Sequence, residues 1–468
     1  MSYFSLIYLG IFSLIISVLS FFNIIYSYYF NLYLSIDSYL YSLVFSLLFG
    51  LIFLFKKKDN YKINIYHKIL TVILGYFLLP LILSIPFYLS IYNITFLDSY
   101  FETISGFTST GFTIFENIKH LDQSLILWRS STQWIGGLYF LFSIILLIDI
   151  FDNNLKKSLT NFITFDTSET LKQSFKILIL YTVLTFLIFI SLKIFDFRTF
   201  DSFNLSMTLI SSGGFLPFNN LSLVLNSNPK EVIFSILMLV SFFSIFLSYN
   251  LVFLKNRNIN FFYEDIYLFF YLLSLIFIFF SFLNFEYDFS LLFFSIASSI
   301  SNIGFSLENA PKNLSFIFLI LVIIGGSFFS TSSGIRFFKL YILFKFSLNN
   351  LISHVRPINV SIKKQLFSEI SLDSFIINKY FLSVIIFIIS LLFLSSFLTF
   401  FGISFENSFK ISILTLMNTV NSSMYGVEDF NFQNLQFVIK YFLIIFMIIG
   451  RVELFTVLII LKKFLFKN

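Results

Sequence analysis

The sequence predicts an all-α integral membrane protein of about ten transmembrane helices, on three observations. Hydrophobic residues make up 58% of the chain and charged residues 12%, whereas a soluble domain carries about 25% charged residues. Apolar segments of roughly 20 residues, enough to cross a hydrocarbon core of about 30 Å, recur along the chain. Short polar phrases interrupt them. The expected spans are residues 4–33, 38–55, 68–94, 124–150, 173–195, 231–254, 264–285, 314–346, 376–401 and 434–464.

The polar phrases are residues 106–112 (GFTSTGF), 209–215 (LISSGGF), 299–305 (SISNIGF) and 418–424 (NTVNSSM). We take Gly111, Gly214, Gly304 and Ser423 as equivalent positions. Each phrase follows a helix too short to cross a membrane, predicted at about 98–107, 199–210, 289–300 or 406–419. Non-helical backbone survives at membrane depth only where it is buried in protein or lines a cavity. Four such phrases therefore indicate four segments around one pore.

This pattern divides the chain into two leading helices and four similar units. The leading helices occupy residues 1–60, and each unit reads span, short helix, polar phrase, span. The units are predicted at residues 61–152, 153–258, 259–350 and 351–468, the last with a preceding cytoplasmic loop and a C-terminal tail.

Basic residues predict the orientation. Lysine and arginine lie at 56–58, 156–157, 255–257, 336–364 and 462–463, all on one face if there are ten spans. That face is cytoplasmic by the positive-inside rule, which places both termini there. We expect the protein to lie in the cytoplasmic (inner) membrane. The other face would form an acidic mouth that concentrates cations. Its acids are Asp98, Glu102, Glu116, Asp122, Asp196, Asp201, Glu286, Asp288, Glu308, Glu406, Glu428 and Asp429.

The phrases carry the chemistry expected of a cation path. Carbonyl oxygens can replace the water around an ion, and glycine permits the backbone angles that such a segment needs. Each short helix would point its negative dipole end at the phrase. The chain has no cysteine, and its three histidines lie far apart, so we expect no enzymatic activity and no covalent cofactor.

Four segments resemble one known family. Residues 101–111 (FETISGFTSTG) are similar to the first filter of the Trk/Ktr/HKT superfamily of potassium transporters. Residues 129–137 (RSSTQWIGG) resemble the helix after it, residues 324–336 (IGGSFFSTSSGIR) the glycine-rich third segment, and residues 450–456 (GRVELFT) the last helix. The two leading spans favour the TrkH/TrkG-like branch over the shorter KtrB branch.

The resemblance implies potassium uptake through a four-repeat selectivity filter, with K⁺ as the transported ion. It also implies a homodimer, a cytoplasmic nucleotide-binding TrkA-like regulatory subunit and no nucleic-acid partner. The basic loop around 347–364 is interpreted either as a partner contact or as an ordinary solvated loop. The implied filter residues are Thr108, Ser109, Thr110, Gly111, Ser212, Gly213, Gly214, Asn302, Ile303, Gly304, Asn421, Ser422 and Ser423.

The implied gate is the glycine- and serine-rich loop below the filter, which would break the third-repeat helix. Its residues are Gly325, Gly326, Ser330, Thr331 and Gly334, with Arg451 from the last helix. An ionisable residue inside an apolar span indicates function. Arg451 would repel cations or bind the loop. Arg129, beside Trp128 near the outer interface, is interpreted as a snorkelling or anchoring residue.

The fourth phrase departs from the family pattern, in which asparagine, any residue and glycine follow one another. Here Ser423 takes the expected glycine position, or Gly426 does if the alignment is three residues off. Since a serine there accompanies sodium permeation among plant-type relatives, a filter that passes both sodium and potassium is the alternative. A membrane enzyme and a non-transporting scaffold remain rivals from other classes.

Overall fold

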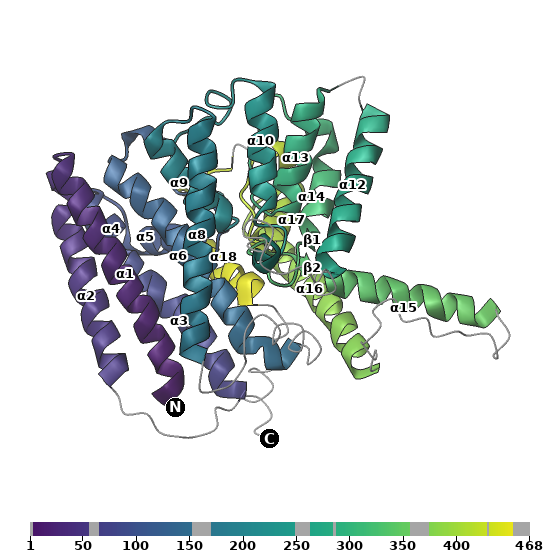
Figure 1. Ribbon diagram of the computed structural model, residues 1–468, viewed down its shortest axis with the longest axis horizontal. Coiled ribbons are helices and arrows are strands. Elements are labelled where there is room, and N and C mark those ends of the chain that lie inside the picture. The colour runs from purple at the N-terminus through teal and green to yellow at the C-terminus, as the bar shows by residue number, and fades with distance from the viewer. Residues whose placement is uncertain are drawn as a thin grey trace.

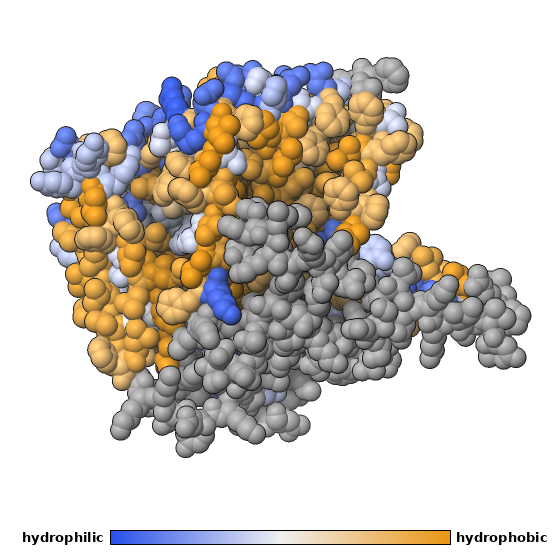
Figure 2. Space-filling view, in the orientation of Figure 1, coloured by the Kyte–Doolittle hydropathy of each residue, from blue (hydrophilic) through white to orange (hydrophobic). Residues whose placement is uncertain are grey.

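The chain folds into a bundle of long helices that surround shorter ones (Figure 1). The structure, a computed structural model, describes residues 3–55, 65–151, 170–248, 263–283, 287–355, 374–427 and 430–452. Figure 2 shows hydrophobic side chains in a broad band over the sides of the bundle and hydrophilic ones along its upper edge. This is the surface of a protein whose sides face lipid.

Seven helices in the described ranges are long and apolar enough to cross a membrane. They confirm the predicted class of a multi-span helical membrane protein. One of the seven spans runs through two helices, α3 and α4, with Pro80 inside α3. The helices are α1 (Tyr3–Tyr29), α2 (Ile36–Phe55), α3 (Ile65–Leu83) with α4 (Ile85–Ser90), α6 (Gln123–Phe151), α8 (Thr170–Ile194), α12 (Tyr263–Leu283) and α16 (Ser374–Phe400).

Four short helices lie where the sequence predicts them, each twelve residues long. They are amphipathic, and they bury most of their residues inside the bundle. The four are α5 (Phe96–Phe107), α9 (Thr199–Ile210), α13 (Phe289–Ile300) and α17 (Phe405–Leu416).

The short helices and the helices that follow them pack in a closed cycle. The helix after each short helix also contacts the next short helix: α6 packs on α9, α10 (Asn228–Leu239) on α13, α14 (Ser315–Ile323) on α17, and α18 (Phe437–Val452) back on α5. The C-terminal ends of all four short helices therefore face one central region.

Two predicted spans differ from the structure, and a third is described only in part. The span expected at 231–254 is broken, since α10 ends at Leu239 and residues 240–244 are not helical. The span expected at 314–346 is interrupted, as the glycine- and serine-rich loop predicts: α14 ends at Ile323 and α15 (Phe337–Val355) starts after it. The span at 434–464 is helical in α18, and residues 453–464 lie outside the described residues.

The two interruptions have one physical cause, which hydropathy cannot reveal. The backbone carbonyls of Ser241 and Phe242 accept hydrogen bonds from the amides of Ser332 (3.1 Å) and Ser327 (3.0 Å). Carbonyls that accept these bonds no longer accept the hydrogen bonds of their own helix. A two-residue parallel pair, β1 (Ile324–Gly325) with β2 (Ile335–Arg336), then closes the loop on itself. Beyond it, α15 projects away from the bundle (Figure 1).

Glycines bring the ends of the short helices close to the helices behind them. A Cβ atom on Gly136 of α6 would lie 2.7 Å from the Cα of Phe107, the last residue of α5. A Cβ on Gly450 of α18 would overlap the carbonyl oxygen of Leu416, the last residue of α17. Both are closer than real Cβ contacts allow, so these two positions require glycine.

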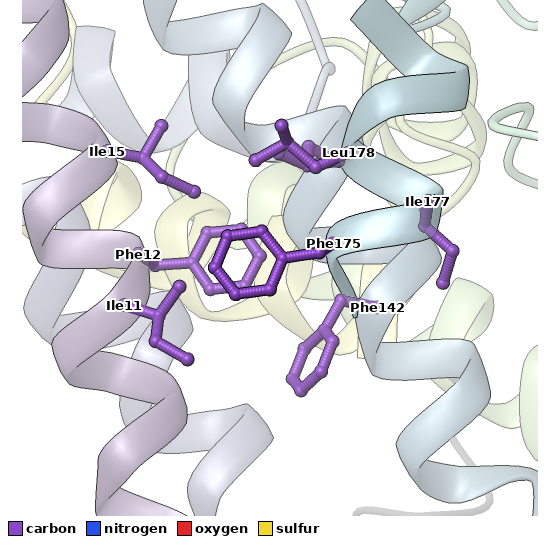
Figure 3. A pocket seen from close by; sticks show the side chains of 8 residues that line it. Ile11, Phe12, Ile15, Phe142, Phe175, Ile177 and Leu178 are labelled. Atoms are coloured by element: carbon purple, nitrogen blue, oxygen red, sulfur yellow. The ribbon is translucent and has the colours of Figure 1, made fainter. Parts of the chain in front are cut away.

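The leading helices α1 and α2 pack along one side of the bundle (Figure 1). Between α1, α6 and α8 lies a pocket whose walls are hydrocarbon throughout (Figure 3). With no polar group in its lining, this pocket offers nothing to coordinate an ion. It is lined by Ile11, Phe12, Ile15, Leu138, Phe142, Phe175, Ile177 and Leu178.

Candidate ion-binding site

Each of the four short helices ends in the same way. One residue follows the last helical residue in a right-handed or bridge conformation, and the next is left-handed. The left-handed residues are Ser109 (φ 59°), Ser212 (φ 56°), Asn302 (φ 59°) and Asn418 (φ 48°). Left-handed residues other than glycine are uncommon, so four at matched positions define a structural alignment of the loops.

Backbone hydrogen bonds show the same cap. The amide of Ser109 donates to Gly106 O (2.9 Å) and that of Thr110 to Ser105 O (2.9 Å). This is the Schellman pattern, which satisfies carbonyls at a helix end. The second and fourth loops repeat both bonds, and the third repeats the first of them.

This alignment fixes which residues are equivalent, and it corrects the prediction for the fourth loop. Two positions beyond the left-handed residues stand Gly111, Gly214, Gly304 and Val420, which we call the ring position. Ser423 and Gly426 are both too far along the chain to occupy it.

The residues predicted for the fourth loop lie elsewhere in it. Ser423 begins a short 3₁₀ helix (Ser423–Tyr425), and its hydroxyl pairs with that of Ser306 (2.8 Å). Asn421 and Ser422 connect the ring position to that helix, with the Asn421 amide donating to Val427 O (3.4 Å). Gly426 is exposed and left-handed (φ 68°) and ends the turn.

Glycine was the signal used to align the phrases, and the fourth loop has none at the ring position. The asparagine signal would have found it: Asn302-Ile303-Gly304 matches Asn418-Thr419-Val420. The second asparagine, Asn421, favoured the alignment on Ser423 equally well. Asn418, Thr419 and Val420 are therefore the site residues that the sequence reasoning missed.

Side chains of the left-handed residues join the loops to one another. Asn418 Nδ2 donates to Thr110 Oγ1 of the first loop (3.0 Å), and Asn302 Nδ2 donates to Thr419 Oγ1 of the fourth (3.3 Å). The Ser212 hydroxyl donates to Ser301 O of the third loop.

The first and second loops meet through backbone, since a Cβ atom on Gly111 would lie 2.7 Å from Gly214 Cα. Within the first loop, the hydroxyls of Thr108 and Thr110 pair with each other at 2.8 Å. All four loops are thus in contact with a neighbour.

Eight backbone carbonyls in these loops have no hydrogen-bond donor among the described residues. They belong to the ring position and the position before it, where every residue except Val420 is fully buried. More than 90% of buried carbonyls in proteins are paired. A group of unpaired ones beside four negative helix ends is a site that favours a cation. The eight are on Thr110, Gly111, Gly213, Gly214, Ile303, Gly304, Thr419 and Val420.

A buried ion pair supports the first two loops from behind. Arg129 Nε donates to Glu102 Oε1 (2.9 Å), and Glu102 Oε2 accepts from the Ile114 amide (2.9 Å). The guanidinium also binds Thr113 Oγ1 (3.1 Å) and stacks over Phe215 at 4.1 Å. Arg129 is 1% exposed, so its interpretation as a snorkelling residue is wrong: it is a buried crosslink.

The acidic outer face is less acidic than the sequence suggests. Glu102 is neutralised by Arg129, and Asp98 pairs with the buried Lys440 at 2.5 Å. Glu406 is exposed, and its hydrogen bond and charge interaction with Lys410 (2.6 Å) hold its pKa below the usual value. Glu286, Glu428 and Asp429 lie outside the described residues, as do most of the basic residues used to predict orientation.

The predicted gate residues form one buried loop beneath the ring. Gly325 lies in β1, and Gly334 precedes β2 with φ 81°. The Thr331 hydroxyl donates to Ile210 O at the end of α9 (2.7 Å), and the Ser330 hydroxyl accepts from Arg336 Nη1 (3.2 Å). The Gly326 amide donates to Ser332 Oγ (3.0 Å). The loop therefore docks directly against the second short helix.

Two further groups hold this loop that the sequence reasoning did not identify. Arg336 Nη1 donates to Ser327 O and Ser332 O, both at 3.0 Å. Glu264, at the start of α12, accepts from the Phe328 amide at 2.9 Å. An arginine and a glutamate inside apolar segments were the available signals.

Arg451 lies between the predicted gate loop and the first of the four loops. It is 1% exposed, donates to the Ser333 hydroxyl, and has Nη2 3.3 Å from Ser109 Oγ. Its guanidinium carbon lies 3.9 Å from the ring centre of Phe140. Its contact with the predicted gate loop runs to a side-chain hydroxyl.

The chain is similar in sequence to known cation transport proteins. A family model described as "TrkH: Cation transport protein" matches residues 36–248. An uncharacterized cation transporter of Methanocaldococcus jannaschii is 28% identical over 91% of this chain and 88% of its own length. The Trk system potassium uptake protein TrkG of Escherichia coli is 25% identical over 88% of each chain.

Among solved structures, the chain is similar in fold to the potassium transporter TrkH from Vibrio parahaemolyticus. The TM-score is 0.84, with 20% identity over 98% of this chain and 99% of that one. In sequence the chain is similar to cation transport proteins of the Trk/Ktr/HKT superfamily, in its TrkH/TrkG-like branch. In fold it is similar to a multi-span membrane protein of that branch.

The buried ion pair gives a first testable prediction. Arg129→Met leaves the Glu102 carboxylate buried without its cationic partner, which costs about 3–5 kcal/mol. We expect a large loss of thermal stability in detergent, measured by the melting temperature of the purified protein. The double variant with Glu102→Gln should recover part of it. Glu406→Gln removes an exposed carboxylate and should leave the melting temperature unchanged. Equal melting temperatures for Arg129→Met and Glu406→Gln would contradict the account.

Proposed function

We propose that the protein takes up potassium across the cytoplasmic membrane through the ring formed by its four loops. The observation that carries this proposal is the group of eight unpaired carbonyls, two from each loop. Carbonyl oxygens replace the hydration shell of K⁺ in filters of this type. The predicted ion-binding set is accordingly revised to include Asn418, Thr419 and Val420.

The identity of the ion is taken from related proteins. The TrkG and TrkH proteins similar to this chain are named for potassium uptake, and we carry K⁺ over to the ring. The inward-negative membrane potential contributes about 2.3 kcal/mol per charge per 100 mV. In this proposal, residues 61–152, 153–258, 259–350 and 351–468 are the four pore repeats.

The gate in this proposal is the loop from Gly325 to Gly334. Its contacts with Ile210, Arg336 and Glu264 support a docked, closed arrangement beneath the ring. Arg451 supports closure in two ways, because its guanidinium binds Ser333 and places a positive charge near Ser109. Opening requires the loop to leave these contacts.

The assembly proposed is a homodimer with both termini in the cytoplasm and a TrkA-like regulatory subunit. The projecting helix α15, with exposed Phe344 and Leu351, supports a partner contact on that side. The predicted contact loop at 347–364 is described only as far as Val355.

A growth test addresses the proposed function. Expression in a bacterium that lacks potassium uptake should restore growth at limiting potassium, with or without a co-expressed regulatory subunit. Gly304→Ala should abolish the rescue, because a Cβ atom there would lie 2.8 Å from Val420 O. Gly402→Ala is the matched control: its φ of 90° is similar to the 82° of Gly304, but nothing lies within 4 Å.

Failure of the wild-type chain to rescue growth in both settings, with the protein in the membrane, would overturn the proposal. Rescue by Gly304→Ala would overturn the assignment of the ring. The sodium-permeable alternative is tested by sodium and rubidium uptake into liposomes. Equal fluxes of the two ions would favour it over a potassium-selective filter.

The gate is tested by replacing Arg451. Arg451→Met removes both the loop contact and the charge, and we expect a faster rubidium flux in liposomes. A rate increase of about tenfold corresponds to a barrier lowered by about 1.4 kcal/mol. Arg451→Lys keeps the charge and should stay slow if repulsion dominates. An unchanged flux in Arg451→Met would show that Arg451 takes no part in gating.

A further inference from the structure

The ring position is occupied by three glycines and one valine. Val420 is the residue that the left-handed cap of Asn418 places in line with Gly111, Gly214 and Gly304. A glycine has no side chain to fill the centre of the ring, whereas valine brings two methyl groups on a branched carbon. The fourth loop therefore differs from the others at a position where the loops are in contact.

The side chain of Val420 lies against all three glycines. A Cβ atom placed on Gly214 would lie 2.5 Å from Val420 Cβ and 3.1 Å from each of its methyl carbons. On Gly111 it would lie 3.0 Å from Val420 Cβ, and on Gly304 it would lie 2.9 Å from Val420 Cγ1. The space that three glycines leave open is the space that the isopropyl group takes.

The backbone accommodates valine here without strain. Gly111 and Gly304 have φ values of 80° and 82°, which side chains resist, while neither Gly214 nor Val420 has a positive φ. Val420 is partly exposed, as are Asn421 and Ser422 after it, whereas Thr419 before it is fully buried. Its side chain thus stands where buried loop gives way to the solvent-accessible side of the ring.

We propose that Val420 is an apolar constriction in line with the ion path and that its volume limits the rate of permeation. The inference rests on the proposed function. An ion that has exchanged water for carbonyls must pass the ring position, and methyl groups there offer no oxygen. Packing of the valine against three backbones leaves no room for a hydrated ion beside it. Permeation then requires the side chain or the fourth loop to move aside.

Rubidium uptake into liposomes by purified protein tests this constriction. Val420→Gly should raise the flux by about tenfold, which corresponds to a barrier lowered by about 1.4 kcal/mol. The flux of Val420→Ala should lie between those of the wild type and Val420→Gly, since alanine keeps the Cβ and loses both methyl groups. Val420→Thr keeps the volume and should remain as slow as the wild type. Val427→Gly is the matched control, because it removes a buried valine from the same loop outside the ring.

The possible results distinguish failure of the proposed constriction from failure of the transport function on which it rests. Equal fluxes in wild type and Val420→Gly, both above protein-free liposomes, would overturn the constriction and leave transport intact. A flux in Val420→Thr equal to that in Val420→Gly would overturn volume as the cause. No flux in either protein, with vesicles shown to be sealed, would overturn the transport function itself. Melting temperatures of all variants establish that each is folded.

Discussion

The structure depends on how four short helices end inside a membrane protein. Each short helix must end at a place without bulk water. It must pair most of its last carbonyls and still leave the carbonyls that follow unpaired. One left-handed residue after each helix achieves this, since the cap bonds use the carbonyls of the final turn and release those that follow. Serine or asparagine at that position also bridges to a neighbouring element, as Asn418 does to Thr110. The four helix caps and the ring are therefore parts of one structure.

The surrounding helices pack closely around the caps and the ring. Gly136 and Gly450 let long helices touch the ends of α5 and α17, and the Glu102–Arg129 pair ties the first loop to the second from behind. Below the ring, the broken helix at 240–244 gives up carbonyls to the gate loop. The chain thus combines four closely packed loops with a lower loop held by hydrogen bonds. In the proposed function, the first are the filter and the second is the gate.

Much of the fold could be predicted because it rests on periodic, local signals. Long apolar runs gave seven spans in the described ranges, and short polar-ended segments gave all four short helices. What could not be predicted depends on contacts between distant residues. The interruption near Ser241 arises from pairing with Ser332, and the burial of Arg129 arises from Glu102. The fourth loop was misaligned because glycine was used as the marker, while the left-handed conformation, which asparagine also adopts, is what the four loops share.

The central claim is that ions pass through the ring where Gly111, Gly214, Gly304 and Val420 meet. Locating a heavy potassium substitute by anomalous diffraction from crystals of Val420→Gly in rubidium tests it most directly. The account predicts a rubidium peak at the ring, within coordinating distance of carbonyl oxygens from all four loops. A well-ordered ring without a peak, with rubidium bound elsewhere between the helices, would contradict it.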